Sequence, residues 1–153
     1  MLRGSTSHLS DCAKIADGVT MIDVSDEMWQ GIPSNMTMPD GYRGTFDGNG
    51  ATIKLTMAIS GGYQVGFFNT LDAGGVIKNV TIDGTVSGNY DVGGVCGRNG
   101  GTIIDCNNKA DVSGKNDRVG GIAGSCMDGG KLIAFKTMSN SGKIEAGSRV
   151  GGI

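Results

Sequence analysis

The sequence predicts an all-β fold, a solenoid of about four coils made of short strands. A Val-Gly string followed by apolar residues recurs at 65–68, 92–97, 119–124 and 150–153, with spacings of 27, 27 and 31 residues. A period of this size is typical of stacked repeats, in which one short unit cannot bury its own apolar face and lies on its neighbour. Glycine supplies 29 of 153 residues and proline only 2, which favours dense turns and excludes collagen-like or proline-rich chains.

Residues 1–40 precede the repeats and are predicted to form an N-terminal cap and lead-in. The stretch from Ile15 to Val24 is expected to form a strand or short turn that covers the first coil, because an uncovered coil exposes a row of backbone donors and acceptors. Trp29 is interpreted as part of the packing of this cap rather than as a ligand-stacking ring. His8, the only histidine, has no partner arrangement for nucleophilic catalysis.

Residues 41–153 are predicted to be the repeats, with copies at 41–73, 74–100, 101–130 and 131–153. In each copy apolar and polar residues alternate briefly and Gly, Asn or Asp follows, which is the pattern of a strand and a turn. Alignment of the copies places apolar side chains in columns that should form the core. The three columns are Ile77, Ile103 and Phe135; Val80, Cys106 and Met138; and Val86, Val112 and Ile144.

This part of the chain resembles the GLUG-motif repeat family, glycine-rich repeats of large bacterial surface proteins. The resemblance rests on GTFDGNGATI at residues 44–53 and on the successive Val-Gly-Gly strings. It implies a right-handed β-helix-like rod for adhesion, display or structural assembly, and it brings no catalytic residue. Two departures are Phe67, which stands where later copies have a second glycine, and the altered fourth copy around Phe135.

The resemblance also implies a location at the cell surface or outside the cell. The N-terminus lacks the basic and then apolar pattern of a secretory signal, so we expect a fragment of a longer protein or a component of a virion. The last Val-Gly-Gly string stops within a repeat, and we expect self-association through this open C-terminal coil. The four cysteines form no CxxC pair, and Cys106 is interpreted as a small buried hydrophobe.

The charge and hydropathy of the chain limit the kinds of partner that it is expected to bind. Thirteen basic and fifteen acidic residues give a net charge of −2 with no block of one sign, so we expect no nucleic-acid partner. No apolar run approaches the roughly 20 residues that span a bilayer, so we expect no membrane insertion. A glycan or a host or cell-surface protein is the expected partner. The candidate ligand edge consists of residues that precede the Val-Gly strings: Asn89, Tyr90, Asp91, Lys115, Asn116, Asp117, Arg118 and Arg149.

Two other functions stay open: a phage virion fibre or receptor-binding component, and a polysaccharide-cleaving β-helix enzyme. Glycoside cleavage needs two carboxylates that face one substrate. The aligned columns place Asp83 on Lys109 and Asn79 on Asp105, so they do not accumulate acid. We therefore expect no enzyme and no cofactor. Asp47 is interpreted as a turn residue that accepts hydrogen bonds from local backbone N–H groups, in preference to a catalytic residue or a ligand of structural calcium.

Overall fold

The computed structural model describes residues 12–28 and 41–153, except for the side chains of residues 24–28. The described residues form sixteen strands and no helix, and every strand pair is parallel. Parallel pairing between successive copies is the signature of a solenoid, and the predicted all-β solenoid of about four turns is confirmed. In the described part of the chain, no helix is long and apolar enough to cross a membrane.

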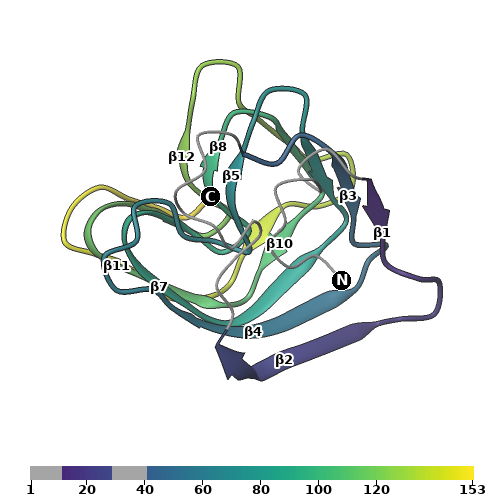
Figure 1. Ribbon diagram of the computed structural model, residues 1–153, viewed down its shortest axis with the longest axis horizontal. Coiled ribbons are helices and arrows are strands. Elements are labelled where there is room, and N and C mark those ends of the chain that lie inside the picture. The colour runs from purple at the N-terminus through teal and green to yellow at the C-terminus, as the bar shows by residue number, and fades with distance from the viewer. Residues whose placement is uncertain (1–11, 29–40) are drawn as a thin grey trace.

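Three parallel sheets run along the stack, and the coils that contain β5, β8 and β12 cross all three (Figure 1). The first sheet contains β1 (Ala13–Lys14), β3 (Thr45–Asp47), β6 (Val76–Lys78), β9 (Thr102–Ile104) and β13 (Lys131–Ile133). The second contains β2 (Met21–Met28), β4 (Thr52–Ala58), β7 (Thr81–Gly93), β10 (Asn107–Asn108), β11 (Asp111–Gly120), β14 (Ser139–Asn140), β15 (Ile144–Ala146) and β16 (Val150–Gly151). The third contains β5 (Phe68–Leu71), β8 (Cys96–Asn99) and β12 (Ala123–Cys126).

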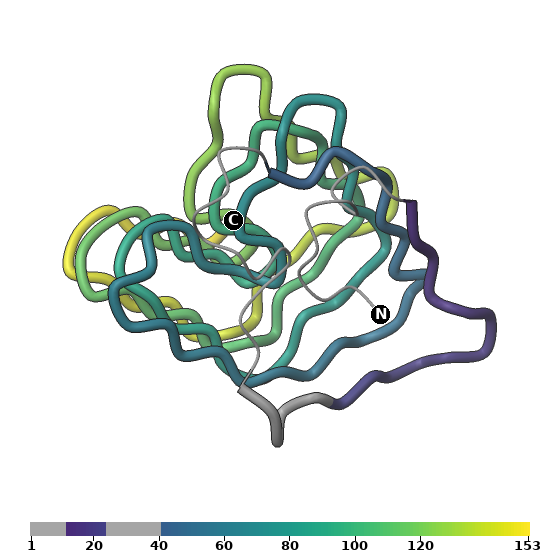
Figure 2. The backbone as a smooth tube through the Cα atoms, in the orientation of Figure 1, coloured from purple at the N-terminus to yellow at the C-terminus, as the bar shows by residue number. Residues whose placement is uncertain are grey.

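The described part of the N-terminal segment lies on the first repeat as a further rung. β1 pairs with β3, and β2 pairs with β4 in parallel, so residues 21–24 lie along the first strand of the second sheet in the first repeat. Figure 2 shows this segment in purple along the outside of the stack. Trp29 and His8 lie outside the described residues.

The core consists of apolar columns that run through successive coils. Ile77 pairs with Ile103 and Val86 with Val112, and Val112 pairs in turn with Ile144. Four of these side chains are at most 1% exposed, namely Ile77, Ile103, Val86 and Val112. Burial of such side chains contributes roughly 1.5–3 kcal/mol each. The predicted third column is confirmed in full, and Met138 packs against the core as predicted.

Phe135 does not continue the column of Ile77 and Ile103. Leu132 pairs with Ile103 instead, and Phe135 is 77% exposed. The cause is a loop after β13, in which the Asp105 carboxylate accepts hydrogen bonds from the backbone N–H groups of Phe135, Lys136 and Thr137. The pairing offset between the third and fourth repeats grows across this loop, from Ile104 with Ile133 to Asn107 with Ser139, and the phenyl ring lies in solvent.

Phe67, the departure in the first copy, belongs to an aromatic cluster in the core. Its ring contacts those of Phe46 and Phe68 edge to face, with centroids 5.6 and 5.1 Å apart, and Tyr42 packs on Phe68. In the next coils the same register position is Gly94 and then Gly121, because successive backbone hydrogen bonds join Phe67 to Gly94 and Gly94 to Gly121. The first coil thus fills with an aromatic ring the position that later coils leave as glycine.

Cys96 and Cys106 are buried, whereas Cys12 and Cys126 are exposed, and none of the four forms a disulfide. Burial raises the pKa of the Cys106 thiol to about 12 and raises that of Cys96 as well. Both thiols therefore stay protonated at neutral pH and pack as small hydrophobes. The interpretation of Cys106 as a buried hydrophobe is confirmed.

Candidate binding edge and groove

The predicted ligand edge forms where β7 and β11 pass around a bend of the coil (Figure 1). Val92 pairs with Val119 and Tyr90 with Asp117, so residues that precede the valines lie side by side on neighbouring coils. We call this set the polar edge. Its members are Asn89, Tyr90, Asp91, Lys115, Asn116, Asp117, Arg118 and Arg149.

Six of these residues are joined in pairs that cross from one coil to the next. Arg118 approaches Asp91 in a fork, with Nε 2.6 Å from Oδ1 and Nη2 donating to Oδ2 at 3.0 Å. Arg149 makes the same kind of fork with Asp117, with Nε donating to Oδ1 at 2.9 Å. Asn116 donates from Nδ2 to Oδ1 of Asn89. Lys115 is exposed and makes no ion pair with the described residues.

The two ion pairs differ in burial. Asp91 is only 3% exposed, so its charge needs the guanidinium of Arg118, which is itself partly exposed. Asp117 and Arg149 lie nearer to solvent. The hydrogen bond from Arg149 lowers the pKa of the Asp117 carboxyl, and the same bond raises the pKa of Arg149. The Asp117 carboxylate is therefore ionised and paired at neutral pH.

Tyr63 is part of this edge, and sequence reasoning missed it. Its ring stacks on that of Tyr90 with centroids 5.4 Å apart and planes inclined by only 6°, and Tyr63 is 62% exposed. The sequence holds a signal for Tyr63, because it precedes Val65 by two positions, as Tyr90 precedes Val92. In the structure these two valines form a β-bridge. The edge thus begins with two stacked tyrosines on consecutive coils.

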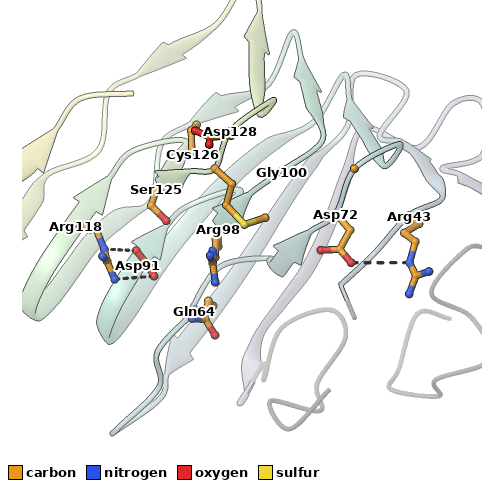
Figure 3. A pocket seen from close by; sticks show the side chains of 12 residues that line it. Arg43, Gln64, Asp72, Asp91, Arg98, Gly100, Arg118, Ser125, Cys126 and Asp128 are labelled. Atoms are coloured by element: carbon orange, nitrogen blue, oxygen red, sulfur yellow. Dashed lines mark hydrogen bonds and ion pairs between the residues drawn. The ribbon is translucent and has the colours of Figure 1, made fainter. Parts of the chain in front are cut away.

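An open groove of about 1020 Å³ adjoins the polar edge and shares Asp91 and Arg118 with it. The residues that line it come from the three repeats that contain β5, β8 and β12, the strands of the third sheet (Figure 3). They are Arg43, Gln64, Asp72, Ala73, Asp91, Arg98, Gly100, Arg118, Ser125, Cys126, Met127 and Asp128. Sequence reasoning did not predict this groove, because the third sheet carries only short strands without an alternating pattern.

Two ion pairs flank Arg98 in the groove, as Figure 3 shows. Arg118 and Asp91 lie on one side, and Arg43 and Asp72 lie on the other, with Arg43 Nε 3.9 Å from Asp72 Oδ2. Asp72 also accepts a hydrogen bond from the backbone N–H of Gly41. The carboxylates of Asp72 and Asp91 are therefore each held by an arginine.

Asp47 is not among the residues of this groove, and it is the last residue of β3, just before a turn. Its Oδ1 accepts hydrogen bonds from the backbone N–H of Asn49 at 2.8 Å and from Nδ2 of Asn79 at 3.1 Å, and Lys78 Nζ lies 3.4 Å from Oδ2. Burial opposes ionisation, but these three partners outweigh it and lower the pKa of Asp47. The predicted turn role is confirmed. Within residues 12–28 and 41–153, no group of three or more His, Cys, Asp or Glu side chains could hold a metal ion.

Comparison with known protein families gives a match to the central part of the chain. The profile of the GLUG motif matches residues 88–113. Because Gly88 pairs with Gly114, this match is one complete coil, which includes Asn89, Tyr90 and Asp91 of the edge and Arg98 of the groove.

Halomucin from Haloquadratum walsbyi (strain DSM 16790 / HBSQ001) is 40% identical over 93 residues, which are 60% of this chain and 1% of halomucin. The chain thus corresponds to a very small part of that relative. No solved structure gives a significant match. The predicted resemblance to the GLUG-motif repeat family is confirmed, and residues 88–113 of this β-solenoid match the GLUG motif.

Proposed function

We propose that this chain is a non-enzymatic adhesion and display module of a surface protein, and that its polar edge binds glycans. The observation that carries the proposal is the continuity of the edge. Tyr63 stacks on Tyr90, and the pairs of Asn116 with Asn89 and Arg118 with Asp91 extend the same face to the following coil.

A glycan fits the chemistry of this face. Flat aromatic rings pack against the apolar face of a sugar, and amide and guanidinium groups donate to its hydroxyls. Neighbouring coils lie about 4.8 Å apart, so the same types of group are offered repeatedly along the rod. The ion pairs hold the arginines and carboxylates in place before a ligand arrives, which reduces the entropy lost on binding.

A surface location is supported by the resemblance and by the size of the relative. Halomucin is so long that the matching 93 residues are 1% of it, which fits a module set within a very long chain. A solenoid suits such a setting, because each coil contacts only its neighbours and the stack forms a stiff rod.

A non-enzymatic role is supported by the carboxylates of the groove. Asp91 is buried and paired with Arg118, and Asp72 is paired with Arg43 and the Gly41 amide. A general acid must hold a proton that it delivers to the leaving group. Two carboxylates that are tied to guanidinium groups are poorly suited to that task.

The test is a glycan array probed with the labelled chain, followed by titration of the hits. We expect Tyr63→Ala and Tyr90→Ala to weaken binding at least tenfold. Phe135→Ala is the matched control, because it removes an exposed aromatic ring that does not belong to the edge. Equal affinity of the tyrosine variants and the wild type, or the absence of any glycan ligand, would overturn the proposal.

A further inference from the structure

The groove beside the polar edge has one guanidinium without a carboxylate of its own. Arg43 and Arg118 each face an aspartate, whereas Arg98 forms no ion pair with any described residue. The remaining acidic residue of the groove, Asp128, is exposed on the turn after β12. The groove is therefore balanced in total charge but holds a local positive centre at Arg98.

Hydroxyl groups flank this centre along the stack. Arg98 lies on β8, the middle strand of its sheet, and it pairs with Thr70 on β5 and with Ser125 on β12. Side chains at paired positions of parallel strands project from the same face. Ser125 and Gln64 line the groove, so a donor and acceptor set surrounds the guanidinium, as Figure 3 shows for Gln64, Arg98 and Ser125.

From this arrangement we propose that the groove binds a sugar that bears a carboxylate, such as a uronic acid unit of an acidic glycan, with the carboxylate on Arg98. The guanidinium presents two parallel N–H donors, which match the two oxygens of a planar carboxylate. Ser125 and Gln64, which line the groove, are placed to bond to the sugar hydroxyls. The two flanking ion pairs keep neighbouring carboxylates from occupying Arg98.

This inference deepens the proposed function, on which it rests, by naming the class of glycan and a second contact surface. A chain that reaches from the groove to the stacked tyrosines would cross the ion pair of Asp91 and Arg118, which belongs to both surfaces. The Arg98 contact is electrostatic, and the tyrosine contact is apolar. Salt and ligand charge therefore distinguish the two.

The experiment titrates the full chain with an oligogalacturonate of defined length and with its methyl ester, by calorimetry at low and high salt. We expect the acid to bind and the ester to bind at least tenfold more weakly. Arg98→Gln should weaken binding of the acid roughly tenfold to a hundredfold, as expected for loss of a charge-assisted hydrogen-bond pair. Arg98→Lys should restore only part of it, because an ammonium lacks the fork.

Lys109→Gln is the matched control, because it removes one exposed positive charge outside the groove and should leave the affinity unchanged. Thermal unfolding of each variant checks that the fold is retained.

Equal affinity of Arg98→Gln and the wild type would overturn the inference, and so would binding of dextran sulfate in preference to oligogalacturonate. Neutral glycans that bind through Tyr63 in a chain indifferent to Arg98 would leave the proposed function standing and overturn this inference alone. Binding of the acid that depends on Arg98 but not on either tyrosine would support the groove and overturn the glycan role of the edge.

Discussion

Gly94 lies directly against the side chain of Asn108 in the following repeat, so that a Cβ on Gly94 would come within 2.1 Å of Asn108 Oδ1. The same relationship recurs one coil later between Gly121 and Asn140. Asn108 cannot move aside, because it is fully buried and its Nδ2 donates to the Ala110 carbonyl and to Asn140 Oδ1. The second glycine of the repeated pair therefore makes room for a stacked asparagine.

Gly94→Ala should destabilise the chain by roughly 1–3 kcal/mol, the usual cost of overpacking a tight interior. The added methyl would also meet the Gly121 carbonyl oxygen at 2.5 Å, which is backbone and cannot rotate away. Gly152→Ala is the control at the same position of the fourth repeat, where a Cβ meets nothing within 4 Å. Urea unfolding of the two variants measures the difference. Equal stability of both would show that the glycine is not needed for space.

Ile103→Asp should unfold the whole rod, since Ile103 is fully buried and pairs with Ile77 on one side and with Leu132 on the other. A carboxylate in this column would lie in an apolar environment without a partner, which costs several kcal/mol. Phe135→Asp introduces the same group at a position that is 77% exposed and should leave the midpoint nearly unchanged. Circular dichroism during heating compares the two. A cooperative transition near the wild-type midpoint in Ile103→Asp would contradict a shared core.

The contrast between Ile103 and Phe135 also shows how far the structure could be predicted from the sequence. Repeat spacing predicted the solenoid, the valine register and the column of Val86, Val112 and Ile144, because identical phases recur in consecutive copies. It failed at Phe135 because the backbone N–H groups of the loop donate to the carboxylate of Asp105, which lies thirty positions earlier in the chain. The polar edge was predictable from its place before each valine, but the groove was not. Arg98 becomes a local centre only because folding assigns other arginines to Asp72 and Asp91.

Asp47 should make the stability of the first repeat depend on acid. Its folded-state pKa lies below the reference value of 3.8, so its ionised form stabilises the fold above that pH. This contribution is lost as the pH falls through the lower folded-state pKa, because the folded chain must then take up a proton. Asp47→Asn should therefore be less stable than the wild type at pH 7 and should approach it as the pH falls below the reference value of 3.8. Urea unfolding across this range measures the effect, with Asp128→Asn on an exposed turn as the charge-matched control. A constant difference between Asp47→Asn and the wild type at all pH values would contradict the linkage.

Cys106 should limit stability in alkali. An accessible thiol in the unfolded chain ionises near pH 9, whereas burial raises the pKa of Cys106 to about 12 in the folded chain. Between these values the unfolded state has lost a proton that the folded state retains, so the free energy of unfolding falls as the pH rises. Cys106→Val should reduce this fall, since Val80 fills the neighbouring position in the same column of the core. Cys126→Ser, at an exposed thiol, should behave as the wild type.

Iodoacetamide provides an independent check at pH 8: the native chain should be alkylated at Cys12 and Cys126, and Cys96 and Cys106 should react only after denaturant is added. Rapid alkylation of Cys106 in the native chain, or an alkaline unfolding profile unchanged by Cys106→Val, would show that this part of the stack opens readily and that its thiol is not held in an apolar layer.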